Sequence, residues 1–232
     1  MFVFRNEDEF KAHVQRALQS DGHTTRREVP VRTGHRLDFL AIKDGVKKGI
    51  EAKFDHRGLL DDLTKSQRLL RLPDLDEMYV CGPKMLMSDD VQAIAAQLGV
   101  GLLALRDDGE LEWLAGPRKL GPARLSLGGN YAGTIEPGGE AKYNATVFNG
   151  GDKAAVDVEV RMVMAGPFVA RYPSKARAKL ALLDGHDQWS PPLVCNVKRS
   201  TKPGNYPLVI SLKAANVPRE DSTVHYQVKP PP

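Results

Sequence analysis

Apolar residues in the first half of the chain follow two different spacings. Phe10, Val14, Ala17 and Leu18 recur every three to four residues, which predicts a helix from residue 6 or 7 to residue 20. Shorter apolar runs bounded by Gly, Pro, Asn or Asp predict strands. The further elements predicted here are strands at 24–31, 36–43, 48–54, 77–81 and 101–105, helices at 59–72 and 88–98, and a hairpin at 105–114. Alternation of helices and strands indicates an α/β domain.

The second half has a different pattern. Four Gly and Pro residues within residues 116–122 predict a linker, which gives domains at residues 1–116 and 122–232. Beyond it come only short β-like runs with turn signals, as in an immunoglobulin-like β-sandwich. The runs are 124–127, 141–148, 156–164, 179–183, 193–197, 206–213 and 223–228. The stretch 141–160, with Asn149-Gly150-Gly151 between two strands, resembles CARDB-type modules, which implies a binding or oligomerisation domain.

Composition excludes several classes of protein. Apolar residues make up 41% and charged residues 27% of the 232, so the chain is neither disordered nor fibrous. No apolar stretch approaches the length that a membrane helix needs, and the charged segment 1–8 lacks a signal-peptide core. We therefore expect a cytoplasmic protein without a membrane partner. Cys81 and Cys195, the only cysteines, exclude a disulfide framework and a Cys-based zinc site.

Charge is distributed unevenly. The net charge is +4, but residues 1–120 carry 19 Lys and Arg against 20 Asp and Glu, and residues 121–232 carry 14 against 9. Within the first half, residues 21–72 hold 12 basic and 8 acidic residues. A local positive field with embedded carboxylates fits a polyanion-binding surface that contains metal ligands, and it fits a solvated mixed-charge face about as well.

The chemistry-bearing residues lie in two consecutive predicted strands. Asp38 is the single polar residue between residues 37 and 42, and a buried carboxylate needs a compensating charge such as a metal ion. In the next strand Glu51 and Lys53 are two residues apart and therefore share a face. Two carboxylates can anchor Mg²⁺, which activates a water for phosphodiester hydrolysis, and the metal and the low-dielectric site are together expected to lower the pKa of the lysine.

Glu-x-Lys alone carries little information, because it occurs three times in this chain. The other two occurrences begin at Glu9, in a predicted helix where residues two apart diverge, and at Glu140, in a strand patterned for solvent. Only the pair at Glu51 follows an apolar strand with its own isolated acid. The context therefore selects Glu51 and Lys53.

This arrangement resembles the restriction-endonuclease-like PD-(D/E)xK nuclease superfamily, above all its Holliday-junction-resolvase and Mrr-type branches, over residues 5–105. The residues that carry the resemblance are Leu37-Asp38-Phe39 and Ile50-Glu51-Ala52-Lys53. It implies an αβββαβ core in which Asp38, Glu51 and the carbonyl of Ala52 bind Mg²⁺ or Mn²⁺ and Lys53 orients or activates water. Leu37 stands where the motif has its proline.

Two further catalytic residues are implied by the resemblance. Glu9 matches the glutamate that many members carry on the first helix, although Glu7 or Asp8 could take its place. Gln67 matches a glutamine that some members place on the following helix, and a solvent-facing amide is an equal alternative. The resemblance thus predicts that both side chains lie close to Asp38 and Glu51.

The expected function is that of a metal-dependent endodeoxyribonuclease that needs no organic cofactor. DNA is the expected partner, and a homodimer is expected from the family. Two alternatives stay open: a catalytically inactive nucleic-acid-binding or scaffold protein, and an RNA-cleaving member of the fold. The basic residues predicted to contact phosphates are Arg26, Arg27, Arg36, Lys48, Lys65 and Arg68.

Overall fold

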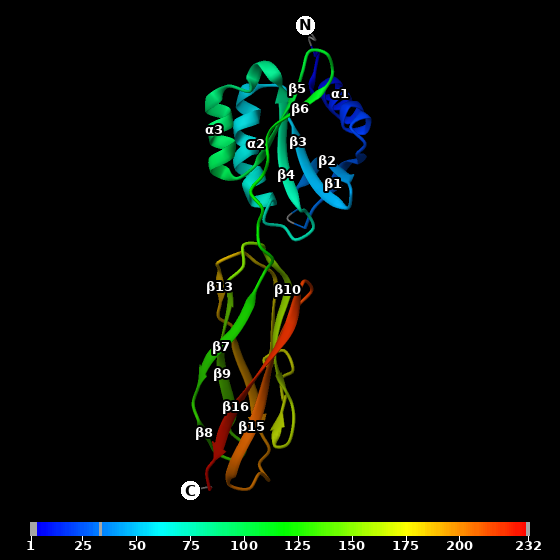
Figure 1. Cartoon of the computed structure of the whole chain (residues 1–232). Helices are drawn as coiled ribbons and strands as arrows, with labels where there is room; N and C mark the ends of the chain where they lie inside the picture. The colour runs from blue at the N-terminus through cyan, green and yellow to red at the C-terminus, as the bar shows by residue number, and fades with distance from the viewer. Residues whose placement is uncertain (1–3, 33, 231–232) are drawn as a thin grey trace. The chain divides into compact units, whose positions relative to one another are not determined.

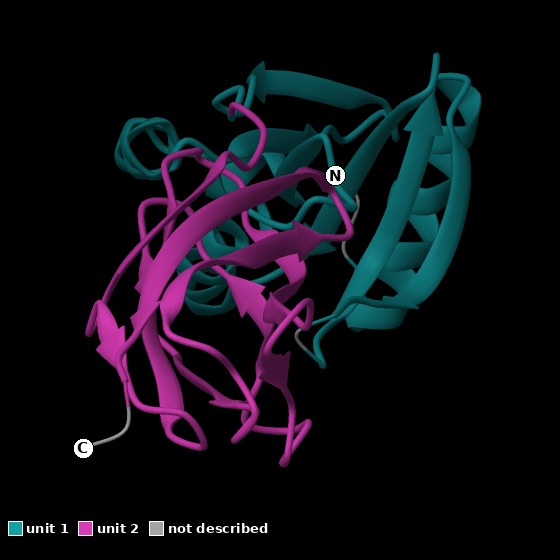
Figure 2. Cartoon of the chain, turned by 90° about the horizontal axis from the view of Figure 1, so that it is seen from below, with its two compact units in different colours: residues 1–120 teal, residues 121–232 magenta. Residues whose placement is uncertain are grey.

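The structure of the protein is a computed structural model, which describes residues 4–32 and 34–230. The chain forms two compact units, residues 1–120 and residues 121–232 (Figure 2). The boundary between them falls inside the Gly- and Pro-rich segment 116–122. Among the described residues, no helix combines the length and the apolar character needed to cross a lipid bilayer.

The first unit is built from a sheet and three α-helices. Its first six elements are α1, three strands, α2 and a strand, in that order. The bounds are α1 Glu7–Ser20, β1 Thr24–Pro30, β2 Arg36–Lys43, β3 Val46–Ala52, α2 His56–Leu69, β4 Glu77–Pro83, a 3-10 turn η1 Lys84–Leu86, α3 Asp89–Leu98, β5 Gly101–Leu105 and β6 Leu111–Ala115.

The six strands form one sheet in the spatial order β1-β2-β3-β4-β5-β6. The pairs β3–β4 and β4–β5 are parallel, and the remaining pairs are antiparallel. Helix α1 packs on one face of the sheet, where Phe10 and Val14 meet Phe39 and Ile50. Helices α2 and α3 cover the other face (Figure 1). Both faces are therefore buried, which explains the continuous apolar runs of the central strands.

Two of the boundaries that differ from the sequence prediction lie next to the predicted catalytic motif. Strand β3 ends at Ala52 and not at residue 54, and α2 begins at His56 and not at residue 59. The cause is Asp55, whose Oδ1 accepts a hydrogen bond from the Gly58 amide at 2.8 Å and so caps the helix. The earlier start adds a turn to the helix that faces Glu51.

The second unit is a β-sandwich of the immunoglobulin-like class. One sheet has the order β12-β10-β15-β16-β8, and the other is formed by β11, β14, β9, β13 and β7. Residues from both sheets, among them Tyr143, Val158, Leu193 and Ile210, form one core. The bounds are β7 Leu125–Tyr131, β8 Thr134–Ile135, β9 Glu140–Asn149, β10 Ala155–Val163, β11 Phe168–Val169, β12 Arg177–Leu183, β13 Gln188–Trp189, β14 Pro192–Val197, β15 Gly204–Ala214 and β16 Val217–Val228.

The seven strands predicted from the sequence correspond to the seven longer strands of this unit. The additional strands β8, β11 and β13 have two residues each. A strand of two residues shows no alternation of apolar and polar positions, so the pattern could not reveal it. Cys81 in the first unit and Cys195 in the second are free and buried.

Candidate functional site

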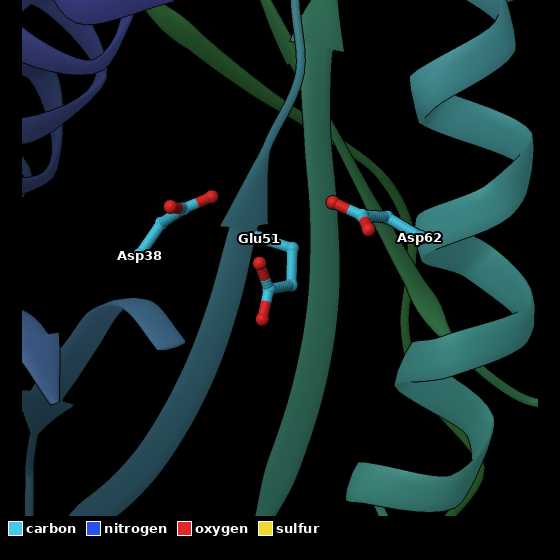
Figure 3. Close-up of side chains that lie close together, drawn as sticks. All are labelled: Asp38, Glu51 and Asp62. Carbon is cyan, nitrogen blue, oxygen red and sulfur yellow. The ribbon is translucent and has the colours of Figure 1, made fainter. Parts of the chain in front are cut away.

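Three carboxylates from three different elements meet inside the first unit. Asp38 comes from β2, Glu51 from β3 and Asp62 from α2, and one oxygen of each lies within 4.8 Å of the other two (Figure 3). All three side chains are buried, Glu51 with 2% exposure. Burial of three acids is unfavourable unless cations neutralise them. The described residues therefore contain one group of oxygen donors suited to a hard divalent cation.

The two strands separate at this point and make room for the cluster. Pairing of β2 with β3 ends at the Phe39–Ile50 pair. Beyond it, Oδ2 of Asp38 accepts a hydrogen bond from the Ala52 amide at 2.8 Å in place of a strand partner. Because N–H and C=O of one strand residue point to the same side, the Ala52 carbonyl also faces Asp38.

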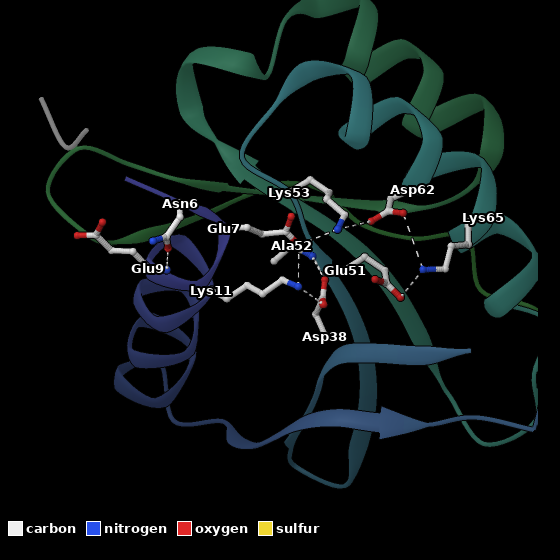
Figure 4. Close-up of polar contacts among 10 residues, drawn as sticks. All are labelled: Asn6, Glu7, Glu9, Lys11, Asp38, Glu51, Ala52, Lys53, Asp62 and Lys65. Atoms are coloured by element: carbon white, nitrogen blue, oxygen red, sulfur yellow. Dashed lines mark hydrogen bonds and ion pairs between the residues drawn. The ribbon is translucent and has the colours of Figure 1, made fainter. Parts of the chain in front are cut away.

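Helix α1 contributes two charged side chains to the site (Figure 4). Oε1 of Glu7 accepts a hydrogen bond from Nζ of Lys53 at 2.8 Å and lies 2.7 Å from Nζ of Lys11. Nζ of Lys11 is also 2.5 Å from Oδ1 of Asp38. Glu7 and Lys11 together therefore link Lys53, after strand β3, to Asp38 on strand β2.

Helix α2 contributes the third lysine. Nζ of Lys65 lies 3.3 Å from Oε1 of Glu51 and 3.8 Å from Oδ1 of Asp62. Nζ of Lys53 is 4.0 Å from the other Asp62 oxygen. These are ion pairs without hydrogen-bond geometry, since Oε1 of Glu51 and Oδ2 of Asp62 are buried and have no hydrogen-bond partner. Buried carboxylate oxygens in this state are available as metal ligands.

Burial sets the direction of the pKa shifts of two acids in the site, and hydrogen bonding and charge set that of Lys53. Burial raises the pKa of Glu51 to about 8. The charges of Asp38 and Asp62 also raise it, and the charge of Lys65 lowers it. Burial also raises the pKa of Asp62, although Lys65 and Lys53 oppose the rise. For Lys53, burial lowers the pKa, but the hydrogen bond to Glu7 and the nearby acids outweigh it, so the pKa is raised. The lower pKa expected from the sequence is that of a site with a bound metal, so it stays a prediction. Without metal, the hydrogen bond to Glu7, which the sequence interpretation had not placed at the site, raises the pKa of Lys53.

The structure brings four residues of the predicted set together: Asp38, Glu51, Ala52 and Lys53. It adds Asp62, which the sequence interpretation missed. A signal was present, because Asp62 follows Leu59 by three residues and so shares its inward stripe on the helix. An acid on an apolar stripe is as unusual in a helix as Asp38 is in its strand.

Glu9 and Gln67 are not brought to the cluster. Oε2 of Glu9 accepts a hydrogen bond from the Arg5 amide at 2.8 Å, and its own amide donates to the helix cap Asn6 (Figure 4). Glu7 takes its place because Glu7 and Lys11, four residues apart, share the face that is turned toward the sheet. Gln67 is half-buried and lies about 140° around the helix from Asp62.

The predicted phosphate-binding residues are spread over the unit. Among them, Lys65 contacts the acidic cluster, and Lys65 and Arg68, both on α2, line a groove of about 420 Å³. Arg26 and Arg27 are neighbours on the edge strand β1, so they point to opposite faces of the sheet. Arg36 is exposed at the start of β2. These residues do not form one continuous surface.

Lys48 belongs to another part of the unit, at the opposite end of β3 from Ala52. Its Nζ lies 4.3 Å from the ring centroid of Trp113, 3.3 Å from Nε2 of His23 and 3.9 Å from Glu77. These three contacts hold the Lys48 side chain against other residues of the first unit.

Comparisons with known proteins do not identify a family. No family model matches the chain. No curated protein matches it either. Among solved structures, a CARDB domain from Pyrococcus furiosus in complex with di-metal ions is 16% identical, with 47% of this chain and 90% of that chain covered and a TM-score of 0.35.

Two further solved structures show similar values. The sporulation control protein Spo0M from Bacillus subtilis is 11% identical, with 47% of this chain and 50% of that chain covered and a TM-score of 0.33. Native alpha-2-macroglobulin from Escherichia coli is 14% identical, with 47% and 17% covered and a TM-score of 0.38. Because all three TM-scores are below 0.5, these similarities give no information about function.

Proposed function

We propose that this protein is a Mg²⁺-dependent nuclease that hydrolyses phosphodiester bonds of DNA, and that its first unit is a PD-(D/E)xK-type nuclease domain. The observation that supports the proposal is the meeting of Asp38, Glu51 and Asp62 in a buried cluster with Lys53 beside it. The order of the first six elements, αβββαβ, agrees with the proposed domain.

The donor set fits a hard divalent cation. Asp38, Glu51 and Asp62 would hold it, with the Ala52 carbonyl as a further oxygen donor on the same side. Oε1 of Glu51 and Oδ2 of Asp62, which lack hydrogen bonds, are the oxygens with free capacity. When bound, Mg²⁺ supplies a hydroxide nucleophile at neutral pH and neutralises charge that develops on the phosphate.

Lys53 acts as a hydrogen-bond donor. In the metal-free protein its pKa is raised, because the hydrogen bond to Glu7 and the nearby acids outweigh the effect of burial, so the side chain is present as an ammonium donor. A fixed ammonium can orient the attacking water and stabilise negative charge on the phosphate oxygens. Glu7 holds Nζ of Lys53 in position through their 2.8 Å hydrogen bond.

A cleavage assay on the full chain tests this function. Single-stranded, duplex and branched DNA, and RNA, would be incubated with the protein and Mg²⁺ or Mn²⁺. We expect the protein to cleave DNA and EDTA to abolish this cleavage. Lys53→Ala and Asp38→Asn should both lose cleavage, and Lys53→Ala should still bind DNA. Lys47→Ala, at the exposed start of the same strand, is the matched control and should cleave normally.

Each other outcome points to a defined alternative. Cleavage of RNA alone would make the protein a ribonuclease on the same site. Binding of nucleic acid without cleavage under any metal would favour the inactive binding or scaffold protein. Full cleavage by Lys53→Ala would refute the assignment of Lys53.

A further inference from the structure

Lys65 separates the acidic cluster from a surface groove. Its ammonium faces inward, 3.3 Å from Oε1 of Glu51 and 3.8 Å from Oδ1 of Asp62 (Figure 4). Its side chain, 31% exposed, also lines the groove of about 420 Å³. The other residues that line the groove are His35, Asp61, Thr64, Arg68 and Leu69. The Lys65 side chain thus borders both the acidic cluster and the open groove.

The inward position of Lys65 follows from charge neutralisation. Lys11 contacts Asp38, and Lys65 is the cation that contacts both Glu51 and Asp62. A divalent ion bonded to the same carboxylate oxygens would take over this neutralisation. It would also repel the ammonium strongly, because two cations a few ångströms apart interact in a partly buried, low-dielectric space.

The groove offers the released ammonium a suitable ligand. Arg68 lies three residues after Lys65, on the same side of α2, so both cations can reach a ligand there. Lys and Arg donate charge-assisted hydrogen bonds to phosphate oxygens. A cavity of this volume is within the size range of small-ligand sites and can take one phosphate group with its sugar.

We infer that Lys65 is an internal counter-cation that the divalent ion displaces from Glu51 and Asp62, and that it then binds a backbone phosphate of DNA in the groove together with Arg68. This inference rests on the proposed nuclease function and adds an order of binding: the metal first, the phosphate second. The metal thereby creates part of the DNA-binding site.

The test compares Lys65→Met with Lys47→Met, which removes the same charge at the far end of β3. Mn²⁺ affinity is measured by calorimetry without DNA, at a pH where protons no longer compete for Glu51. DNA affinity is measured by anisotropy of a fluorescein-labelled duplex and its single strand, with Mn²⁺ and with EDTA. A Lys53→Ala background keeps the DNA intact, and thermal melting verifies that each variant is folded.

We expect Lys65→Met to bind Mn²⁺ about fivefold more tightly, because no ammonium has to leave. With Mn²⁺, its DNA affinity should fall about fivefold more than that of Lys47→Met. In EDTA the two variants should lose affinity equally. Arg68→Met should weaken DNA binding in Mn²⁺ without changing the affinity for Mn²⁺.

Unchanged or weaker Mn²⁺ binding by Lys65→Met would overturn the displacement. An equal loss of DNA affinity with and without Mn²⁺ would overturn the order of binding. Failure of the unsubstituted chain to bind Mn²⁺ at all would instead refute the proposed nuclease, so the two failures are distinguishable.

Discussion

Glu7 and Lys53 lie 46 residues apart in the chain and are joined by a 2.8 Å hydrogen bond from Nζ to Oε1. Lys11 approaches the same Glu7 oxygen at 2.7 Å. These two lysines lower the pKa of Glu7 against the effect of burial, so the carboxylate remains ionised. The first helix therefore fixes the position of the lysine that follows strand β3.

Glu7→Gln is expected to lower the cleavage rate about tenfold, because the amide loses the charge that holds the Lys53 ammonium. Glu7 is a positioning residue, so kcat should fall while KM and Mn²⁺ affinity change less than about twofold. Steady-state cleavage kinetics and metal titration would measure this. Glu9→Gln, two residues away and bonded to Arg5, is the matched control. Equal cleavage rates for Glu7→Gln and Glu9→Gln would show that Glu7 does not position Lys53 for the reaction.

Asp62→Asn is expected to weaken Mn²⁺ binding more than about tenfold, because the variant loses one of three anionic ligands. Asp61→Asn, the adjacent exposed acid, should bind the metal normally. Without metal, Asp62→Asn should melt at the same temperature as the unsubstituted chain or higher, since burial raises the pKa of Asp62 and so disfavours its charged form in the folded protein. Calorimetry and thermal melting test both expectations, and unaltered metal affinity would exclude Asp62 as a ligand.

The sequence predicted the parts of the site that lie on strands. Asp38 stood out because it interrupts an apolar strand, and the alternation of β3 placed Glu51 and Lys53 on one face. These are local relations, because side chains on a strand alternate with a period of two. The order of helices and strands in the first unit followed from the same periodicities.

The sequence did not reveal contacts between distant elements. Whether Glu7 or Glu9 faces the sheet depends on the rotation of α1, which Phe10 and Val14 set by packing. Asp62 shares the inward stripe of Leu59 on α2, but only the packing of this helix on the sheet, a contact between elements distant in the chain, brings its carboxylate to Asp38 and Glu51.

Stability of the metal-free protein should decrease as the pH rises toward 8. The pKa of Glu51 is about 8 in the folded state and ordinarily near 4.5, so in this interval the folded protein binds a proton that the unfolded chain releases. Stability then falls with rising pH and levels off above about pH 8. Saturating Mg²⁺ should abolish this slope, because the metal keeps the Glu51 carboxylate ionised in the folded protein as well as in the unfolded chain.

The measurement is urea unfolding of the unsubstituted chain and of Glu51→Gln between about pH 6.5 and 9. The difference between the two removes contributions of other groups, among them His23, whose pKa is lowered by burial and by the charge of Lys48. Without metal the difference should change by an amount on the order of 1 kcal/mol per pH unit below pH 8. A pH-independent difference would show that Glu51 titrates normally.

The second unit is expected to supply DNA affinity. Residues 121–232 carry 14 basic and 9 acidic residues, whereas residues 1–120 carry 19 and 20, so the positive excess lies entirely in the sandwich. Residues 1–120 form a compact unit and should keep the metal site when produced alone. They should nevertheless bind DNA more weakly than the full chain, because fewer phosphates are neutralised.

Salt dependence distinguishes this role from a dimer surface. The difference in affinity between the full chain and residues 1–120 should shrink as salt rises, because phosphate neutralisation acts through counterion release and is screened. Anisotropy titrations at low and high salt would measure it, and equal affinities at low salt would contradict the electrostatic role. If light scattering then gave a dimeric full chain and a monomeric first unit, the sandwich would hold two copies together and so supply the two active sites that cleavage of both strands of a duplex requires.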